Sequence, residues 1–63
     1  GSELDRAFLT DMIGHHMGAI MMARSVLPHA DSAEIRELAE NIVASQSAEI
    51  VQMRDYLAAL QRK

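Results

Sequence analysis

The sequence predicts an all-α fold, an antiparallel helical hairpin that dimerises into a four-helix bundle. Two observations predict it. A single proline, Pro28, divides the 63 residues into two long stretches, both dominated by residues of high helix propensity. Apolar residues recur three and four positions apart in each stretch, which is the spacing of one face of a helix.

The first helix is expected over about residues 3–27. Ser2 followed by Asp5 is typical of a helix N-cap with an acidic third position, and Pro28 disfavours helical geometry in the residue before it. Residues 1–2, Gly-Ser, resemble the remnant of a cleaved purification tag, so the single domain is taken as residues 3–63. At about 100° per residue, one face of this helix gathers an apolar stripe with polar residues at its margin. The stripe consists of Leu4, Phe8, Met12, His15, Ala19, Met22, Ala23 and Val26, with Asp5 and His16 at the margin.

The second helix is expected over about residues 32–61, after a short connection at residues 28–31. Asp31 or Ser32 is expected to cap it, because Glu34 lies in the first turn that follows. Two polar residues, Gln46 and Glu49, interrupt its apolar stripe. That stripe consists of Ile35, Leu38, Ala39, Ile42, Val43, Gln46, Glu49, Ile50, Met53, Leu57 and Leu60.

A hairpin of two amphipathic helices leaves much of each apolar face in contact with water. A chain of this length is also near the lower limit at which a fold can bury enough surface by itself. Pairing of two hairpins buries both stripes, so we expect a homodimer or a higher homo-oligomer.

Composition excludes several classes of function. The net charge is −3 and the six basic residues are scattered along the sequence, so we expect no nucleic-acid partner. No apolar run approaches the roughly 20 residues of a membrane span. Neither the Glu-x-x-His pair of di-iron proteins nor a nucleophile motif occurs, so we expect no enzyme, no catalytic residue and no organic cofactor.

Adjacent histidines in a methionine-rich helix indicate a metal site. The chain has five methionines, three histidines and no cysteine, so imidazole and thioether are its soft ligands. Met12 lies three residues before His15 and four before His16, which allows a thioether and an imidazole to share one helix face. Met22 and Met53 are the expected additional ligands. These donors favour Cu(I), with Ag(I) behaving similarly.

Three polar residues are expected beside the metal ligands. Asp11, four residues before His15, is placed to accept a hydrogen bond from the second ring N–H of His15, and Gln46 and Glu49 face the histidines from the second helix. An alternative stays open in which His15 and His16 are core residues whose nitrogens are satisfied by Gln46 and Glu49. The protein is then a structural or interaction module, a dimerising hairpin in which a buried polar network fixes the register.

The two helices together resemble the bacterial family catalogued as domain of unknown function 305. The resemblance covers about residues 5–57 and rests on two motifs, Met12-Ile13-x-His15-His16 and Gln46-x-x-Glu49-Ile50-x-x-Met53. Gly14 stands where many members have proline. The resemblance implies a ferritin-like bundle, frequent export from the cytoplasm and, in some members, copper binding linked to copper tolerance. Together with the lack of cysteine, it favours a periplasmic or secreted location, with a cytoplasmic one left open.

Overall fold

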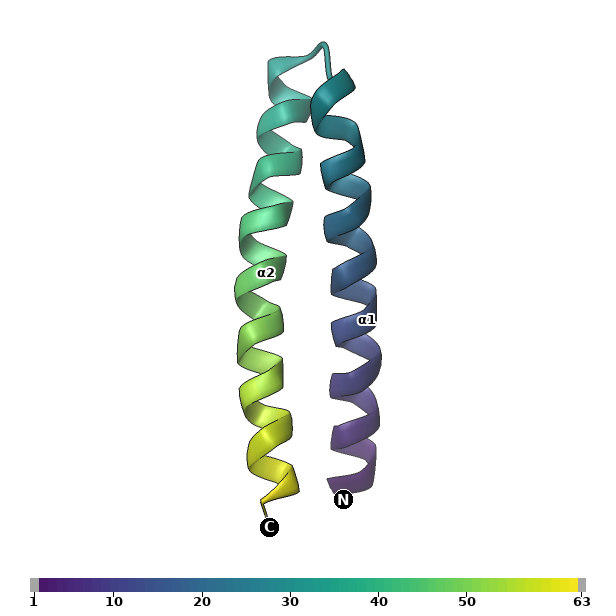
Figure 1. Cartoon of the computed structure of the whole chain (residues 1–63), viewed down its shortest axis with the longest axis vertical. Helices are drawn as coiled ribbons and strands as arrows, with labels where there is room; N and C mark the ends of the chain where they lie inside the picture. Colours follow the sequence, from purple (N-terminus) through teal and green to yellow (C-terminus); the bar gives the residue numbers. More distant parts are fainter. Residues whose placement is uncertain (1, 63) are drawn as a thin grey trace.

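Two long antiparallel helices make up the hairpin (Figure 1). The computed structural model describes residues 2–62, and within them it contains helix α1 (Ser2–Val26), a 3₁₀ turn η1 (Leu27–His29) and helix α2 (Ala33–Gln61). The hairpin is a rod of 48 × 14 × 13 Å. The first residues of α1 and the last residues of α2 lie at one end of the rod, and the connection lies at the other end (Figure 1). Gly1, assigned to a tag remnant, and Lys63, the last residue of the expected domain, lie outside the described residues.

The connection between the helices is short and capped. Pro28 lies in η1, and Ala30 then takes an extended conformation that turns the chain back. Ser32, rather than Asp31, is the N-cap of α2, and its hydroxyl oxygen accepts a hydrogen bond from the Ile35 backbone N–H at 3.3 Å. Arg36 donates to the Ala30 carbonyl oxygen at 2.6 Å, which ties α2 to the turn. At the other end, Ser2, expected as an N-cap, is the first residue of α1 itself.

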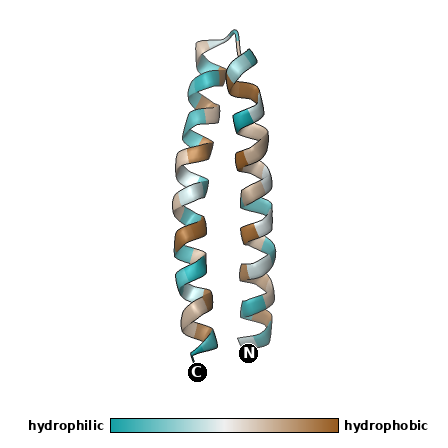
Figure 2. Cartoon of the chain, in the orientation of Figure 1, coloured by the Kyte–Doolittle hydropathy of each residue, from teal (hydrophilic) through white to brown (hydrophobic). Residues whose placement is uncertain are grey.

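The core is the seam where the two helices meet. Its buried centre consists of Leu9 and Ile20 from α1 and Ile50 and Met53 from α2. Five partly buried residues pack around this centre, namely Met12, Ile13, Val43, Leu57 and Leu60. Figure 2 shows hydrophobic residues along the sides of the helices that face one another.

The apolar stripe predicted for α1 is rotated relative to the seam that forms. Leu4 and Met22, expected inside, are 72% and 71% exposed, whereas His16, expected at the margin, is 7% exposed. The rotation is a little less than one residue's step of about 100°. It arises because α1 carries apolar residues on neighbouring faces, and α2 packs on the face that contains Leu9 and Ile20. The stripe predicted for α2 agrees better with the face that α2 buries. Three of its members are nevertheless exposed, namely Ile35 and Leu38 at its start and Glu49.

Rotation of the seam leaves an exposed apolar surface on one side of the hairpin, called the open face below. Phe8, His15 and Met22 follow one another at intervals of seven residues along α1, so they lie on nearly one line. Leu38 and Tyr56 are about five helical turns apart on α2 and therefore project in the same direction. The open face consists of Leu4, Phe8, His15 and Met22 of α1 and Ile35, Leu38, Ile42 and Tyr56 of α2. Neither helix, over the residues described, is long and apolar enough to cross a membrane.

Candidate metal site at the helix seam

A buried histidine joins the two helices near the middle of the rod. The Nε2 atom of His16 lies 2.5 Å from Oε1 of Glu49, and this is the single contact between a basic and an acidic side chain within residues 2–62. The imidazole is almost fully buried, whereas the Glu49 side chain is 52% exposed. A carboxylate only accepts hydrogen bonds, so Nε2 carries the proton. In the neutral ring, Nδ1 is left with the free lone pair.

Two methionines lie one turn away from this pair. Met12 precedes His16 by four residues on α1, and Met53 follows Glu49 by four residues on α2. In an antiparallel pair held in register by His16 and Glu49, these steps run in the same direction along the rod, so Met12 and Met53 lie at one level. Met53 is buried, and Met12 packs against the cluster that contains it. The structure therefore places three of the five predicted ligands, Met12, His16 and Met53, within about one helical turn of one another along the seam.

The other two predicted ligands lie elsewhere. His15 is exposed on the open face, about 100° around α1 from His16. Met22 is exposed on the same face, two turns further along. The adjacent histidines therefore do not form a joint chelate within one hairpin, because one projects into the seam and the other projects out of it.

The three polar residues predicted beside the ligands also separate. Glu49 forms a hydrogen bond with His16, which agrees with both the metal-site and the core-histidine interpretations. Gln46 is half-buried one turn away and forms no hydrogen bond with either histidine among the described residues. Asp11 is exposed and lines a shallow surface hollow with His15, without a hydrogen bond between them.

The side chains that line the seam near His16 include soft donor atoms, two thioether sulfurs and one imidazole nitrogen. The described part of the chain contains no group of three or more His, Cys, Asp and Glu residues placed so that they could together hold a metal ion. Thioether sulfur is a soft donor that suits Cu(I), and imidazole nitrogen suits copper as well as zinc, iron and nickel. The residue types of Met12, His16 and Met53 therefore fit a small, soft, univalent ion.

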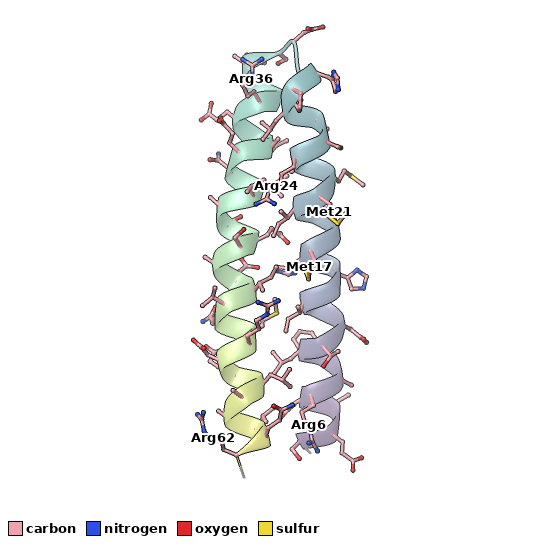
Figure 3. All side chains as sticks on the ribbon, viewed as in Figure 1. Arg6, Met17, Met21, Arg24, Arg36 and Arg62 are labelled. Carbon is pink, nitrogen blue, oxygen red and sulfur yellow. The ribbon has the colours of Figure 1, made fainter. Side chains whose placement is uncertain are left out.

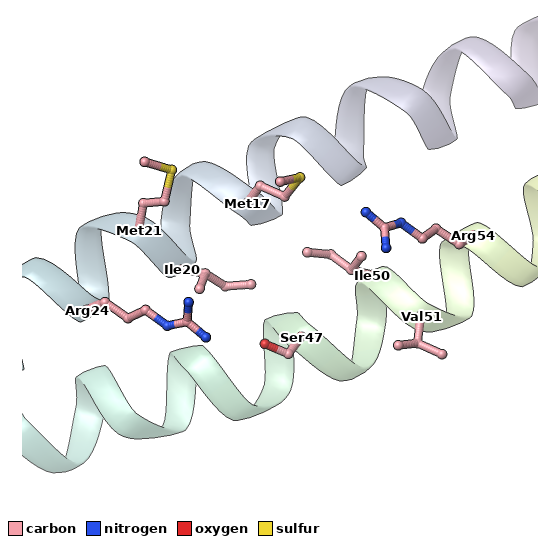
Figure 4. Close-up of a pocket in the computed structure, with 8 residues that line it drawn as sticks. All are labelled: Met17, Ile20, Met21, Arg24, Ser47, Ile50, Val51 and Arg54. Carbon is pink, nitrogen blue, oxygen red and sulfur yellow. The ribbon is translucent and has the colours of Figure 1, made fainter.

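A second cluster lies across the seam on the side opposite the open face, and sequence reasoning missed it (Figure 4). Arg24 of α1 and Arg54 of α2 border a groove there whose floor and rim are apolar. The signal that could have found it is periodicity. Arg6 and Arg24 are 18 residues apart, as are Arg36 and Arg54, and 18 residues make about five full helical turns.

Over its described residues the chain is a helical hairpin with one buried histidine, His16, which is hydrogen-bonded to the half-exposed Glu49. The family model described as "Domain of unknown function (DUF305)" matches residues 1–57, and the chain belongs to this family. The family assigned from the two sequence motifs is therefore confirmed. Comparison with curated proteins and with solved structures finds no match.

Proposed function

We propose that the protein binds a soft univalent metal ion, Cu(I) or Ag(I), and buffers, carries or detoxifies it. Met12, His16 and Met53 are the proposed ligands within one hairpin. One observation carries the proposal: a buried imidazole, oriented by a carboxylate on one nitrogen, lies one turn from two core thioethers. Histidines that bind metals commonly donate their other N–H to a carboxylate in this way.

Each residue has a distinct role in this proposal. Glu49 fixes the ring orientation and the tautomer of His16, which leaves Nδ1 as the nitrogen donor and raises its basicity. Met12 and Met53 supply polarisable sulfur on flexible side chains that adjust to an ion without moving the backbone. Uptake needs no deprotonation of a thiol, so the site suits an oxidising compartment outside the cytoplasm, where we place the protein.

We further propose that two hairpins pair through the open face into a ferritin-like four-helix bundle. Phe8, Met22 and Leu38 are each more than half exposed, and contiguous apolar surface of this kind marks an interaction site. In an isologous dimer the same face meets itself, and His15, near mid-length of the rod, then approaches its counterpart. Pairing is the route by which His15 and Met22 can contribute to metal binding.

A structural role for the same histidine is the second candidate. The hydrogen bond to Glu49 satisfies Nε2, and no buried side-chain nitrogen or oxygen among residues 2–62 is without a partner. A buried polar pair of this kind can set the register between helices, because a slipped pairing leaves the imidazole unsatisfied. In this case His16 and Glu49 specify the fold and bind nothing.

An anaerobic Cu(I) titration against a chromophoric competitor chelator separates the two candidates. The double variant Met12→Leu/Met53→Leu keeps the core volume and removes the thioethers. Its matched control, Met17→Leu/Met21→Leu, changes the same residue types outside the seam. We expect stoichiometric uptake by the wild type and the control, loss of it in the Met12/Met53 variant, and an affinity lowered by about 10–100-fold in Glu49→Gln.

Light scattering on His16→Leu completes the test. If the protein binds metal through His16, this variant loses uptake while the assembly and the helical content remain. If the role is structural, the wild type shows only weak uptake and His16→Leu changes the oligomeric state. Equal Cu(I) affinity in the wild type and the Met12/Met53 variant would exclude the seam site.

A further inference from the structure

The side of the hairpin opposite the open face carries four arginines and is called the arginine face below. Arg24 and Arg54 line one groove, so they lie on the same side of the hairpin. Arg6 and Arg36, each about five helical turns from one of them, project in the same direction. The groove that Arg24 and Arg54 border is otherwise lined by apolar residues and one serine, namely Met17, Ile20, Met21, Ile50, Val51 and Ser47 (Figure 4). Figure 3 shows Arg24 extending over the seam between the helices.

The arginines of this face form no ion pair within residues 2–62. The chain has a net charge of −3, yet no arginine in residues 2–62 contacts a carboxylate, and the one contact there between a basic and an acidic side chain joins His16 to Glu49. Arg36 donates to a backbone carbonyl oxygen at the turn. Arg24 and Arg54, from opposite helices, both extend toward the middle of the groove (Figure 4). Two exposed guanidinium groups therefore flank an apolar centre in which Met21 is 70% and Val51 is 61% exposed.

A second copy of the chain does not suit this face. In an isologous contact the same surface meets itself, which brings Arg24 and Arg54 against the arginines of the other copy. Like charges in contact across an interface are repulsive and suppress the pairing. The two sides of the hairpin thus differ in the partner they fit, since the open face is apolar toward both ends with few charges and the arginine face is cationic around its apolar centre.

We propose that the arginine face docks an acidic amphipathic helix of a partner protein. A groove between two antiparallel helices receives the apolar side of a third helix, with anchors three and four residues apart. Methionine side chains adapt to the shape of what they contact, and arginine forms paired hydrogen bonds to a carboxylate. A membrane surface is the less suitable occupant, because Arg24 and Arg54 lean over the groove rather than away from it.

The spacing of the two arginines sets the spacing of the partner's acidic residues. In the register set by His16 and Glu49, Met17 lies at nearly the same height along the rod as Ser47. Arg24 is seven residues from that height toward the turn, and Arg54 is seven residues from it in the other direction. Their backbones are therefore about 20 Å apart along the rod. Because the side chains converge, we expect carboxylates about 7–11 residues apart, two to three turns of the docked helix.

Fluorescence anisotropy with a designed peptide tests the proposal on the full chain. The probe is a labelled helical peptide with leucines at three- and four-residue intervals and two glutamates about 11 residues apart on the leucine side. Its counterpart carries lysines in place of the two glutamates. We expect the acidic peptide to bind with a Kd of about 100 µM or lower. We expect about 0.5 M salt to release it.

Charge reversal provides the discriminating arms. Arg24→Glu and Arg54→Glu should each weaken binding of the acidic peptide by about 3–10-fold, whereas Arg62→Glu, off the arginine face, should change it by less than about twofold. The double variant Arg24→Glu/Arg54→Glu should bind the lysine peptide more tightly than the wild type does, which a loss of folding cannot produce. Absence of acidic-peptide binding, an equal effect of Arg62→Glu, or binding to phosphatidylglycerol vesicles without peptide binding would each overturn the proposal.

Discussion

Replacing Glu49 with alanine is expected to lower the free energy of unfolding by about 1 kcal/mol. Loss of one partner from a buried hydrogen bond costs about 1–3 kcal/mol, because the remaining group stays desolvated. His16 is 7% exposed, but the Glu49 side chain is 52% exposed, so water reaches the pair and the cost falls at the low end of that range. For a chain of this size, a loss of about 1 kcal/mol lowers Tm by about 4–8 °C.

Circular dichroism at 222 nm during thermal and urea unfolding measures this loss. The protein concentration must be held constant, because pairing through the open face makes Tm depend on concentration. Glu37→Ala is the matched control, since it makes the same change at an exposed position of α2 and reports the helix propensity gained with alanine.

The decisive comparison repeats Glu49→Ala in a His16→Leu background. Without the imidazole, replacing Glu49 leaves no buried group without a hydrogen-bond partner. The replacement should therefore lower the free energy of unfolding by no more than the Glu37→Ala control does. An equal loss in both backgrounds would show that Glu49 stabilises the hairpin by a contact other than the one with His16. No loss in either background would show that the hydrogen bond contributes nothing measurable.

Three further outcomes are expected. Met53→Ala should lower the free energy of unfolding in urea by about 2–4 kcal/mol because Met53 is buried in the seam, whereas Met22→Ala should change it by about 0.5 kcal/mol or less if the chain is monomeric. Gly14→Ala should raise the free energy of unfolding by about 0.5–1 kcal/mol in thermal melts, because the added Cβ meets no atom within 4 Å and alanine favours the helix. Leu38→Glu should convert the proposed dimer to a monomer in light scattering, and a dimer that persists would place the contact elsewhere.

The hairpin and the face that α2 buries were predictable from local signals. One proline between two long helical stretches leaves few alternatives to a helical hairpin, and the observed helices begin and end within one residue of the expected bounds. Along α2 most of the large apolar residues lie toward one side, so periodicity identified Ile50 and Met53 as buried.

The seam on α1 was not predictable in the same way. Apolar residues there occur as adjacent pairs, such as Phe8 with Leu9 and Ala19 with Ile20, and the members of each pair project about 100° apart. Two faces therefore compete, and only packing against α2 decides which one is buried. The same ambiguity applies to His15 and His16. Because the packing buries His16 and leaves His15 exposed, the predicted ligands are divided between the seam and the open face.

The arginine face required both helices to be placed. Arg24 and Arg54 are far apart in sequence and appear scattered when residues are counted along the chain. Their proximity depends on the antiparallel register, which the sequence motifs alone do not specify. Predictions of charge distribution in helical hairpins therefore need the register as well as the composition.

The short connection at Pro28 also orders the steps by which the hairpin closes. Partners next to the turn are separated by few residues, whereas His16 and Glu49, halfway along, are 33 residues apart, and pairs at the far end are separated by more. The entropic cost of closing a loop grows with the length of the loop. We therefore expect the helices to pair first next to the turn and then progressively away from it, and to separate first at the opposite end. The Met12, His16 and Met53 group lies near the middle of the hairpin, so it can stay assembled while the ends near Leu4 and Leu60 open. An ion bound there would hold the two helices together at that point.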